Sequence, residues 1–511
     1  MNDETTPVLI GCGQITQREA DPQAALAPLD LMAQAARLAA EDSGAGRAVL
    51  AQLDSVAVIR LFADTSPRFT CPFGRYANPP RSLAQRLGAT KLQQLVYTHP
   101  GGNMPQYCLN RLAEAITRGE IGSALVVGAE SLATQKAAQR AGLRLDWNED
   151  PGGDFESWGV ATRGWSDVEQ RHGLKAAIVA YPLIENAIRA ALGRTLPEHQ
   201  QAMGVLLARF AAVAAANPLA DRRAGYSAQQ IAHAGPGNPV IASPYTRLMS
   251  ANAFIDQGAA LIMTSVAQAK RLGVPPQHWV YLHGCADAHD HWYLSERREF
   301  HTSPAMRMVF GQALQMAGVS LAEIGAFDLY SCFASAVEVA CESLGLAQDD
   351  PRGLTVTGGL PYFGGPGNNY VSHAIAAMMD SLRAAPGTYG LVTANGNYLT
   401  KHSAGVYSTR PPERAFARPD QAATQAGLDQ APRPRFNDLA DGPARIATWT
   451  VVHDAKGATS AIVLGQTDDG ARFIANTPAD VGLLAEMQDV DQISRKGRVQ
   501  NDGVQNTFVP S

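Results

Sequence analysis

Two glycine-rich segments each precede an apolar pattern that is typical of a helix. Gly101-Gly102-Asn103 comes before the periodic stretch 106–118, and Gly364-Gly365-Pro366-Gly367-Asn368 comes before the stretch 370–383. Glycine lets the backbone approach a ligand closely, and the free N–H groups at a helix N-terminus stabilise negative charge. Two such ends at one pocket would suit a reaction that develops an oxyanion. The alternative is that both segments are simple strand-to-helix turns.

The order of elements around these segments is repeated. The first predicted helix leads into a buried strand, 124–127, and Gly128, and the second leads into the strand 390–393 and Asn395-Gly396-Asn397. A repeated supersecondary unit indicates a duplicated architecture. The repeat therefore predicts an α/β protein built from two related halves.

The regions outside the repeat predict further elements. The N-terminal part predicts a strand at 7–10, a turn at Gly11-Cys12-Gly13, a helix at about 29–42 and a strand at 54–59. Residues from about 130 to 240 differ in composition from the repeat, since they contain three tryptophans and a pair of predicted helices. We interpret them as an insertion packed over the core.

The last hundred residues change composition. A linker rich in Pro, Ala, Gln and Asp extends to about residue 434, and alternating strands follow at 445–452, 459–466 and 472–477. This pattern predicts a three-strand meander in a separate domain.

Composition excludes several classes of function. The 511 residues are 46% hydrophobic and 17% charged, which predicts more than one globular domain. The net charge is −5 with no basic run, so we expect no nucleic-acid partner. The polar N-terminus and the lack of a long apolar run predict a cytoplasmic protein with no membrane segment. Six cysteines without metal-ligand spacing predict reduced thiols and no metal.

Four segments carry a resemblance to a known family: 252–265 (NAFIDQGAALIMTS), 330–345 (YSCFASAVEVACESLG), 358–366 (GGLPYFGGP) and 390–402 (GLVTANGNYLTKH). The chain resembles the thiolase superfamily over residues 5–410, specifically its sterol-carrier-type branch and the thiolase-like proteins of type 1.

The resemblance implies a five-layered αβαβα thiolase fold of two halves, 1–250 and 251–410, with an inserted loop domain at about 130–240. The remaining residues, 411–511, then form a linker and an added β-rich domain, for which a small OB-like barrel is implied.

The resemblance also places four reactive positions on this sequence. The acylated cysteine of thiolases corresponds to Gly102, and the histidine that activates it corresponds to Gly365. The residue that positions a catalytic water corresponds to Tyr330, and the acid/base cysteine falls near Asn395. Because covalent catalysis needs a nucleophile beside a base, these replacements argue against an ordinary thiolase mechanism.

The remaining cysteines and polar residues give the predicted site. Cys108 lies within a predicted helix on the face of Leu112 and is interpreted as a packing residue, as is Cys332. Histidine can act as a general acid or base, and an amide or tyrosine can hold an enolate or thioester oxygen. The predicted catalytic residues are His402, Tyr330, Asn395, Asn103 and His99.

Each histidine has an alternative interpretation, since a loop histidine can simply bond to the backbone, and Lys401 can likewise be structural. The predicted substrate-binding residues are Gly102, Gly365, Asn368, Lys401 and Tyr245. The cluster His283, Asp287, His289, Asp290 and His291 matches no metal template, so we predict a solvated loop there and a solvated His301.

Three functions remain open. The first is an acyltransferase of the acetyl-CoA acetyltransferase type, acting in lipid metabolism by an unconventional or non-covalent mechanism. The second is a carbon–carbon lyase, a retro-aldolase acting on a hydroxyacyl-CoA, which Tyr330 and the C-terminal domain favour. The third is a non-catalytic acyl-CoA-binding protein. All three predict an acyl-CoA partner, no cofactor beyond the coenzyme A of the substrate, and a monomer or homodimer.

Overall fold

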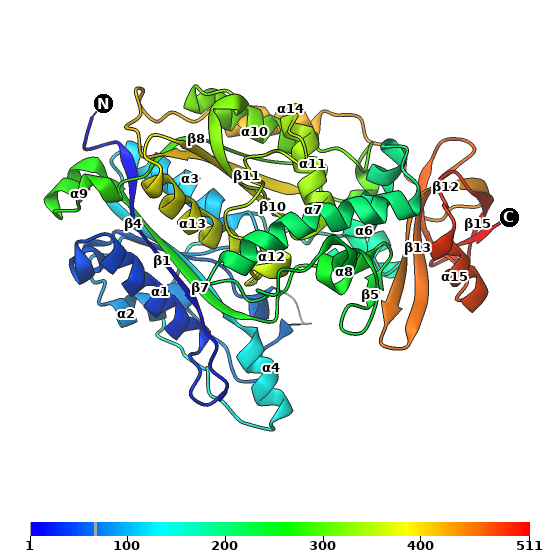
Figure 1. The fold of residues 1–511 in the computed structure, drawn as a ribbon, viewed down its shortest axis with the longest axis horizontal. Helices are drawn as coiled ribbons and strands as arrows, with labels where there is room; N and C mark the ends of the chain where they lie inside the picture. Colours follow the sequence, from blue (N-terminus) through cyan, green and yellow to red (C-terminus); the bar gives the residue numbers. More distant parts are fainter. Residues whose placement is uncertain (1, 66–68) are drawn as a thin grey trace.

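The computed structural model describes residues 2–65 and 69–511, and it contains two stacked sheets (Figure 1). The first sheet has the strand order β1 (Pro7–Thr16), β7 (Asp256–Ser265), β4 (Ser123–Ser131), β2 (Ser55–Val58) and β3 (Gln94–Tyr97). The second has the order β8 (Tyr281–His289), β11 (Lys401–Ser408), β10 (Tyr389–Gly396) and β9 (Ile324–Asp328).

Helices form three layers around these sheets. The central layer consists of α3 (Met104–Thr117) and α13 (Tyr370–Ala384), each of which contacts strands of both sheets. Helices α1 (Pro28–Asp42) and α2 (Pro79–Leu87) cover the outer face of the first sheet. Helix α10 (Pro304–Ala317), with α11 (Ala334–Leu344) beside it, covers the second (Figure 1). The predicted five-layered α/β fold of two halves is confirmed.

The predicted turn at Gly11-Cys12-Gly13 is wrong, because β1 continues through it to Thr16. Both glycines face α1, and a Cβ atom at Gly11 or Gly13 would overlap a carbonyl oxygen of that helix. These glycines are therefore needed for the close packing of β1 against α1. From the sequence alone, glycines in such a strand look the same as glycines in a turn. Strand β7 lies past the predicted boundary at residue 250, yet it is paired on both sides within the first sheet.

The insertion contributes helices that pack against the second half. Its elements are α4 (Leu132–Arg140), α5 (Asp167–Arg171), α6 (Ala177–Ala191), α7 (Leu196–Ala216) and α8 (Ala228–Ala232), followed by the short strands β5 (Val240–Ala242) and β6 (Tyr245–Thr246). Thr195 and Glu198 form a capping box that begins α7. Helices α6 and α7 both contact α11, so the insertion rests on the second half.

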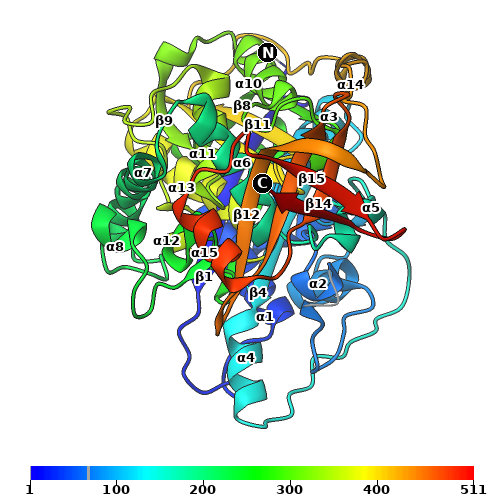
Figure 2. The same ribbon diagram turned by 90° about the vertical axis from the view of Figure 1, so that its right-hand side faces the viewer.

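The C-terminal domain contains a closed sheet (Figure 2). Its strands are β12 (Gly442–Asp454), β13 (Gly457–Thr467), β14 (Arg472–Asn476), β15 (Lys496–Asn501) and β16 (Asn506–Pro510), and β12 pairs with both β13 and β15 to close the ring. Helix α15 (Val481–Asp489) packs beside it, and Trp449, Phe473 and Phe508 lie in its own core. The predicted OB-like barrel is confirmed, with two strands more than the predicted meander.

This domain is attached to the body at several points. Strand β12 pairs with β5 of the insertion, and Asn186 Nδ2 on α6 donates to the Trp449 carbonyl at 2.8 Å. In the linker, Gln421 and Gln425 of α14 (Gln421–Asp429) accept backbone N–H groups of the edge strand β8. Removal of residues 411–511 would leave these groups of the body without their partners.

Strand β3 lies at one edge of the first sheet, and residues 156–158 of the insertion bond to that edge. Glu156 N–H donates to the Leu95 carbonyl at 2.8 Å and its carbonyl accepts from Tyr97 N–H at 2.9 Å. The Trp158 carbonyl accepts from His99 N–H at 2.7 Å. In the described residues, no helix has the length and apolar character needed to cross a bilayer.

Candidate functional site

The two glycine turns meet at the centre of the molecule. The Gly101 N–H donates to Asn368 Oδ1 at 2.9 Å, and Asn368 Nδ2 donates to the Arg60 carbonyl at 2.8 Å. The turn that begins α3 is therefore tied to the turn that begins α13. Asn368, predicted to bind substrate, uses its Oδ1 to hold the two turns together and its Nδ2 to bond to the segment that follows β2.

The space beside Gly102 is filled by a tyrosine from the second half. A Cβ atom at Gly102 would overlap the Tyr330 hydroxyl oxygen and would lie 2.5 Å from the Asn395 carbonyl oxygen. The Tyr330 ring packs edge-on against Tyr370 at 5.8 Å. Burial, followed by the nearby Cys332, raises the pKa of Tyr330 well above its usual value. Its hydroxyl therefore stays protonated at neutral pH and can donate a hydrogen bond.

Gly365 lies in an apolar environment. A Cβ atom at this position would meet Leu360 at 3.3 Å and Ala251 at 3.6 Å, and the Gly365 N–H donates to the Asn252 carbonyl at 2.9 Å. Its predicted contact with substrate would thus come from the backbone alone.

Lys401 lies in the same region as Gly101 and Gly102. Its side chain is 4% exposed, and its Nζ donates to the Pro100 carbonyl. It takes part in none of the ion pairs formed within residues 2–65 and 69–511. Burial lowers the pKa of Lys401 to about 8. An amine with a pKa near neutral can both donate and accept a proton. Lys401 could therefore act as an acid or base in addition to the predicted binding of substrate.

Two asparagine oxygens near Gly102 lack donors. Asn103 Nδ2 donates to Ser403 Oγ at 3.4 Å and Asn395 Nδ2 donates to the Tyr181 hydroxyl at 2.8 Å. The Oδ1 atoms of Asn103 and Asn395 are buried and have no hydrogen-bond partner in the described part of the chain. Since buried acceptors are nearly always paired, these two atoms are suited to a ligand that carries O–H or N–H groups.

Tyr181 was not predicted from the sequence. It lies on α6 of the insertion, stacks on Phe333 at 4.6 Å and accepts hydrogen bonds from Asn395 and from the Leu399 N–H. No motif surrounds it in the sequence. Its role depends on how the insertion docks, which local patterns do not encode.

His402 faces away from this region. Successive residues of β11 point to opposite faces of the sheet, so Lys401 and Ser403 point toward α3 while His402 points toward α10. Its Nε2 lies 3.2 Å from Asp290 Oδ2 and 3.2 Å from Ser303 Oγ, the residue that caps α10. This placement argues against the catalytic role predicted for His402.

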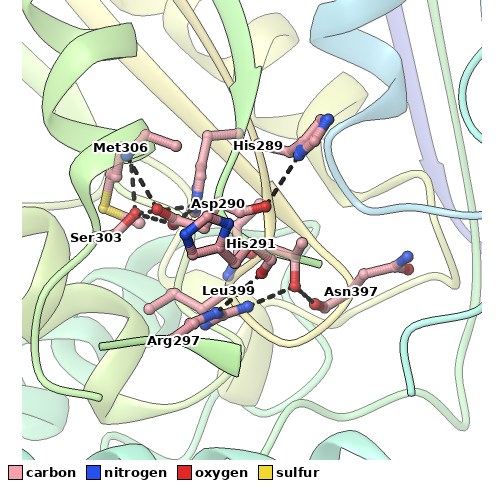
Figure 3. A network of polar contacts seen from close by, with 12 residues as sticks. His289, Asp290, His291, Arg297, Ser303, Met306, Asn397 and Leu399 are labelled. Atoms are coloured by element: carbon pink, nitrogen blue, oxygen red, sulfur yellow. Dashed lines mark hydrogen bonds and ion pairs between the residues drawn. The ribbon is translucent and has the colours of Figure 1, made fainter. Parts of the chain in front are cut away.

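Asp290 lies at the centre of this second network (Figure 3). It accepts hydrogen bonds from Ser303 and from the Ala305 N–H. Burial tends to raise the pKa of Asp290, but the hydrogen bond and charge of His402 and the charge of Arg297 outweigh it, and the net shift is downward. Because the aspartate and the serine share one imidazole nitrogen, the arrangement is a helix-capping network and does not relay a proton along a chain.

The prediction of a solvated loop at residues 283–291 is wrong. Most of it is strand β8, and Asp287 is a buried partner of Arg418 and Asn110. The ring nitrogens of His283, His289 and His291 each bond to a backbone carbonyl. Charged and small residues alternate along 283–289, which is typical of a strand. The many charged residues favoured the interpretation as a loop.

Three further residues named from the sequence have different environments, and only Tyr245 lies where its predicted role does not fit. Tyr245 is fully buried, and its hydroxyl bonds to Glu185 and to Ser335 at 2.6 Å, so it does not reach the surface where a coenzyme could bind. His99 is partly exposed, and burial, Arg60 and Lys401 lower its pKa, so it is neutral near pH 7. Cys108 is fully buried on α3, as its packing role requires.

The insertion packs against residues near Lys401. The Trp292 ring lies 5.9 Å from Lys401 Nζ, and its Nε1 donates to the Arg163 carbonyl at 2.8 Å. Trp165 stacks on Tyr398 at 6.2 Å. The insertion therefore contacts two segments near Lys401, one through Trp292 and one through Tyr398.

Comparisons with known proteins identify the relatives of this chain. Residues 424–504 match the family model described as the thiolase-like protein type 1 additional C-terminal domain. A crystal structure of a monomeric SCP2-thiolase like protein type 1 from Mycobacterium smegmatis superposes with a TM-score of 0.86, at 36% identity over 100% of both chains.

More distant proteins share parts of the fold. The structure named Ltp2-ChsH2(DUF35) aldolase has a TM-score of 0.59 at 19% identity, covering 80% of this chain and 99% of its own. A 3-ketoacyl-CoA thiolase of Salmonella heidelberg (strain SL476) is 28% identical over 195 residues, which is 35% of this chain and 43% of that thiolase.

Proposed function

Because this chain belongs to the SCP2-thiolase-like proteins of type 1, we propose that it binds acyl-CoA thioesters without passing the acyl group to a cysteine. One observation carries this proposal: the Tyr330 hydroxyl fills the space that a side chain at Gly102 would need. A covalent acyl-enzyme requires an activated nucleophile beside the thioester carbon, and Gly102 has no side chain to provide one.

The cysteines elsewhere in the site support the same conclusion. The reactive form of cysteine is the thiolate. Burial raises the pKa of both Cys108 and Cys332, the latter to about 12, so each stays a thiol at neutral pH. We therefore expect neither to replace the missing nucleophile.

Binding would use the groups around Gly102. The Tyr330 hydroxyl can donate to the thioester oxygen, and Lys401 Nζ lies beside Gly101 and bonds to the Pro100 carbonyl. Acyl transfer of the acetyl-CoA acetyltransferase type would then need both substrates at once. No cofactor other than the coenzyme A of the substrate enters this proposal.

A second candidate, retro-aldol cleavage of a β-hydroxyacyl-CoA, is favoured by Lys401 and Tyr330. The neutral Lys401 amine would take the hydroxyl proton, the bond between Cα and Cβ would break, and its electron pair would form the thioester enolate. The Tyr330 hydroxyl would hold that enolate, and protonation of Cα from Lys401 would release the acyl-CoA and an aldehyde or ketone. The similarity to a protein named aldolase supports this at the level of fold.

Mass spectrometry of the intact protein tests the main proposal. After incubation with acetyl-CoA and with longer acyl-CoAs the mass should be unchanged, while calorimetry shows saturable binding. A stable acyl adduct on any cysteine would overturn the proposal.

The lyase is tested by incubation with a β-hydroxyacyl-CoA and detection of a carbonyl product. Turnover that is lost in Tyr330→Phe and kept in Tyr389→Phe would favour cleavage. Tyr389 is a matched control because it is only partly buried and lies at the far end of β10. Binding with no turnover of any thioester would leave a non-catalytic binding protein.

We also propose that the protein is a cytoplasmic monomer. Residues 156–158 occupy the hydrogen-bonding edge of β3, and a relative of the same length is described as monomeric. The six cysteines are unpaired, which suits a reducing compartment. Light scattering coupled to size-exclusion chromatography should give the mass of one chain at micromolar concentration.

A further inference from the structure

Three buried side chains from different helices meet between the insertion and the second half. They are Glu185 on α6, His199 at the start of α7 and Glu338 on α11, with side chains that are 0% to 1% exposed. His199 Nε2 lies 2.6 Å from Glu185 Oε1 and 3.9 Å from Glu338 Oε2. One donor atom from each of the three residues lies within 4.8 Å of the other two.

Glu338 receives no hydrogen bond from a donor group in this cluster. Both of its carboxylate oxygens are buried and neither accepts an N–H or O–H group of the described residues, while the carboxyl of Glu185 lies against it. The nearest cation is Arg194, whose Nη1 is 4.0 Å from Oε1. Because a buried carboxylate is costly without a compensating charge, a second buried carboxylate beside Glu185 calls for either a proton or a cation.

We propose that Glu185, His199 and Glu338 bind one divalent transition-metal ion of the Zn²⁺ type, which joins α6, α7 and α11. One imidazole and two carboxylates form a donor set that zinc uses in proteins. A charge of +2 would balance the two carboxylates.

The spacing of the donors fits such an ion. Zinc bonds to nitrogen and oxygen of about 2.0–2.2 Å separate tetrahedral donors by roughly 3.3 Å. The present separations of 2.6 Å and 3.9 Å from His199 Nε2 lie on either side of that value. Side-chain shifts below about 1 Å would therefore bring the donors into place.

The surroundings of the cluster support binding. The Tyr245 hydroxyl donates to the second oxygen of Glu185 and is itself held by Ser335, which orients the carboxylate as outer-shell partners of metal ligands do.

Two cations, Arg194 and Arg189, lie near the cluster and oppose an added ion, and Arg194 is the one in contact with it. Its Nη1 lies 3.4 Å from His199 Nδ1, which places the imidazole proton on Nε2, toward Glu185. Metal binding would move that proton to Nδ1, and the Arg194 side chain, 31% exposed, can turn toward solvent.

Metal content and thermal unfolding test the proposal. Protein without an affinity tag is incubated with Zn²⁺, freed of excess ion and analysed by elemental mass spectrometry. We expect one zinc per chain and a rise of roughly 3 °C in Tm over chelator-treated protein. Glu338→Gln should lose both effects, whereas Glu342→Gln, one turn further on α11 at an exposed position paired with Arg307, should keep them.

The opposite result is also defined. Wild-type protein that retains no zinc and has the same Tm with Zn²⁺ and with chelator would overturn the proposal, and a proton shared by the two carboxyl groups would then compensate Glu338. If Glu338→Gln does not fold, the ligand-field spectrum of Co²⁺-loaded wild-type protein decides, because tetrahedral Co²⁺ absorbs far more strongly than Co²⁺ in water.

Discussion

The two central helices begin with matching asparagines that differ in what they bond. Asn103 begins α3 and its Oδ1 lies against Gly396 at the end of β10, while Asn369 begins α13 and lies against Gly128 in β4. In each case the asparagine of one half faces a glycine of the other half. The duplication thus preserves the backbone geometry at both turns.

The bonding at the two turns is different. Asn369 Nδ2 donates to the Gly128 carbonyl at 2.7 Å and its Oδ1 accepts from Ser372 at 2.7 Å, so its amide is fully used. Asn103 Oδ1 has no partner among the described residues, and Lys401 lies beside its turn. At the second turn the asparagine amide is fully bonded, whereas at the first turn the Asn103 oxygen is buried without a donor among the described residues. The two duplicated turns therefore share their backbone geometry but differ in the hydrogen bonds of their asparagines.

The largest expected difference between the turns concerns added volume. Gly102→Ala should destabilise the protein by about 3 kcal/mol, because the new Cβ overlaps Tyr330 and meets the Asn395 carbonyl. The Cβ of an alanine at Gly365 would lie 3.3 Å from the nearest atom, so Gly365→Ala should lower the free energy of unfolding by less than about 1 kcal/mol. Denaturant unfolding of both variants measures the difference.

A double-mutant cycle sharpens this result. If the Tyr330 hydroxyl is the obstacle, Gly102→Ala should cost clearly less in a Tyr330→Ala background than in the wild type. Equal costs in the two backgrounds would mean that the Asn395 carbonyl, not the tyrosine, limits the space.

The second prediction concerns the charge at the first turn. Lys401→Met should stabilise the protein by about 2 kcal/mol at pH 7, because it removes a buried ammonium group that has no carboxylate partner. The Lys401 pKa is about 8 in the folded state against 10.5 ordinarily, so between these pH values the unfolded chain binds more protons and wild-type stability rises. The advantage of the variant should shrink over that range.

Unfolding at pH 7 and pH 10 checks both parts. Lys175→Met, at an exposed position, provides the control and should change stability little at either pH. A Lys401 variant that is less stable than wild type at pH 7 would show that the bond to the Pro100 carbonyl outweighs the cost of the buried charge.

The smallest expected effect compares the asparagines themselves. Asn369→Ala should cost about 1 kcal/mol, since it leaves the Gly128 carbonyl unpaired, and Asn103→Ala should cost less. The order should reverse for acyl-CoA affinity measured by calorimetry. Equal losses of affinity in the two variants would remove the functional distinction between the turns.

Local patterns predicted the fold better than the site. The helices that begin after Asn103 and Asn369 carry strong apolar periodicity, and the family resemblance then fixed the layers. The site depends on contacts between distant segments: the direction of His402 follows from the alternation of β11, and Tyr181 arrives from the insertion. Lys401 was predicted to bind substrate, but its lack of an ion-pair partner becomes visible only when its neighbours are known.

The position of β7 affects how the chain can fold as it is synthesised. β7 lies between β1 and β4, yet it follows both by more than a hundred residues. Until Ser265 has left the ribosome, β1 and one edge of β4 have no partner strand, and the loop that covers β3 also appears only after β4. Long-range pairing of this kind is slow, and unpaired strands of apolar sequence aggregate readily. Nascent chains that stop before β7 should therefore depend on chaperones far more than chains that extend beyond it.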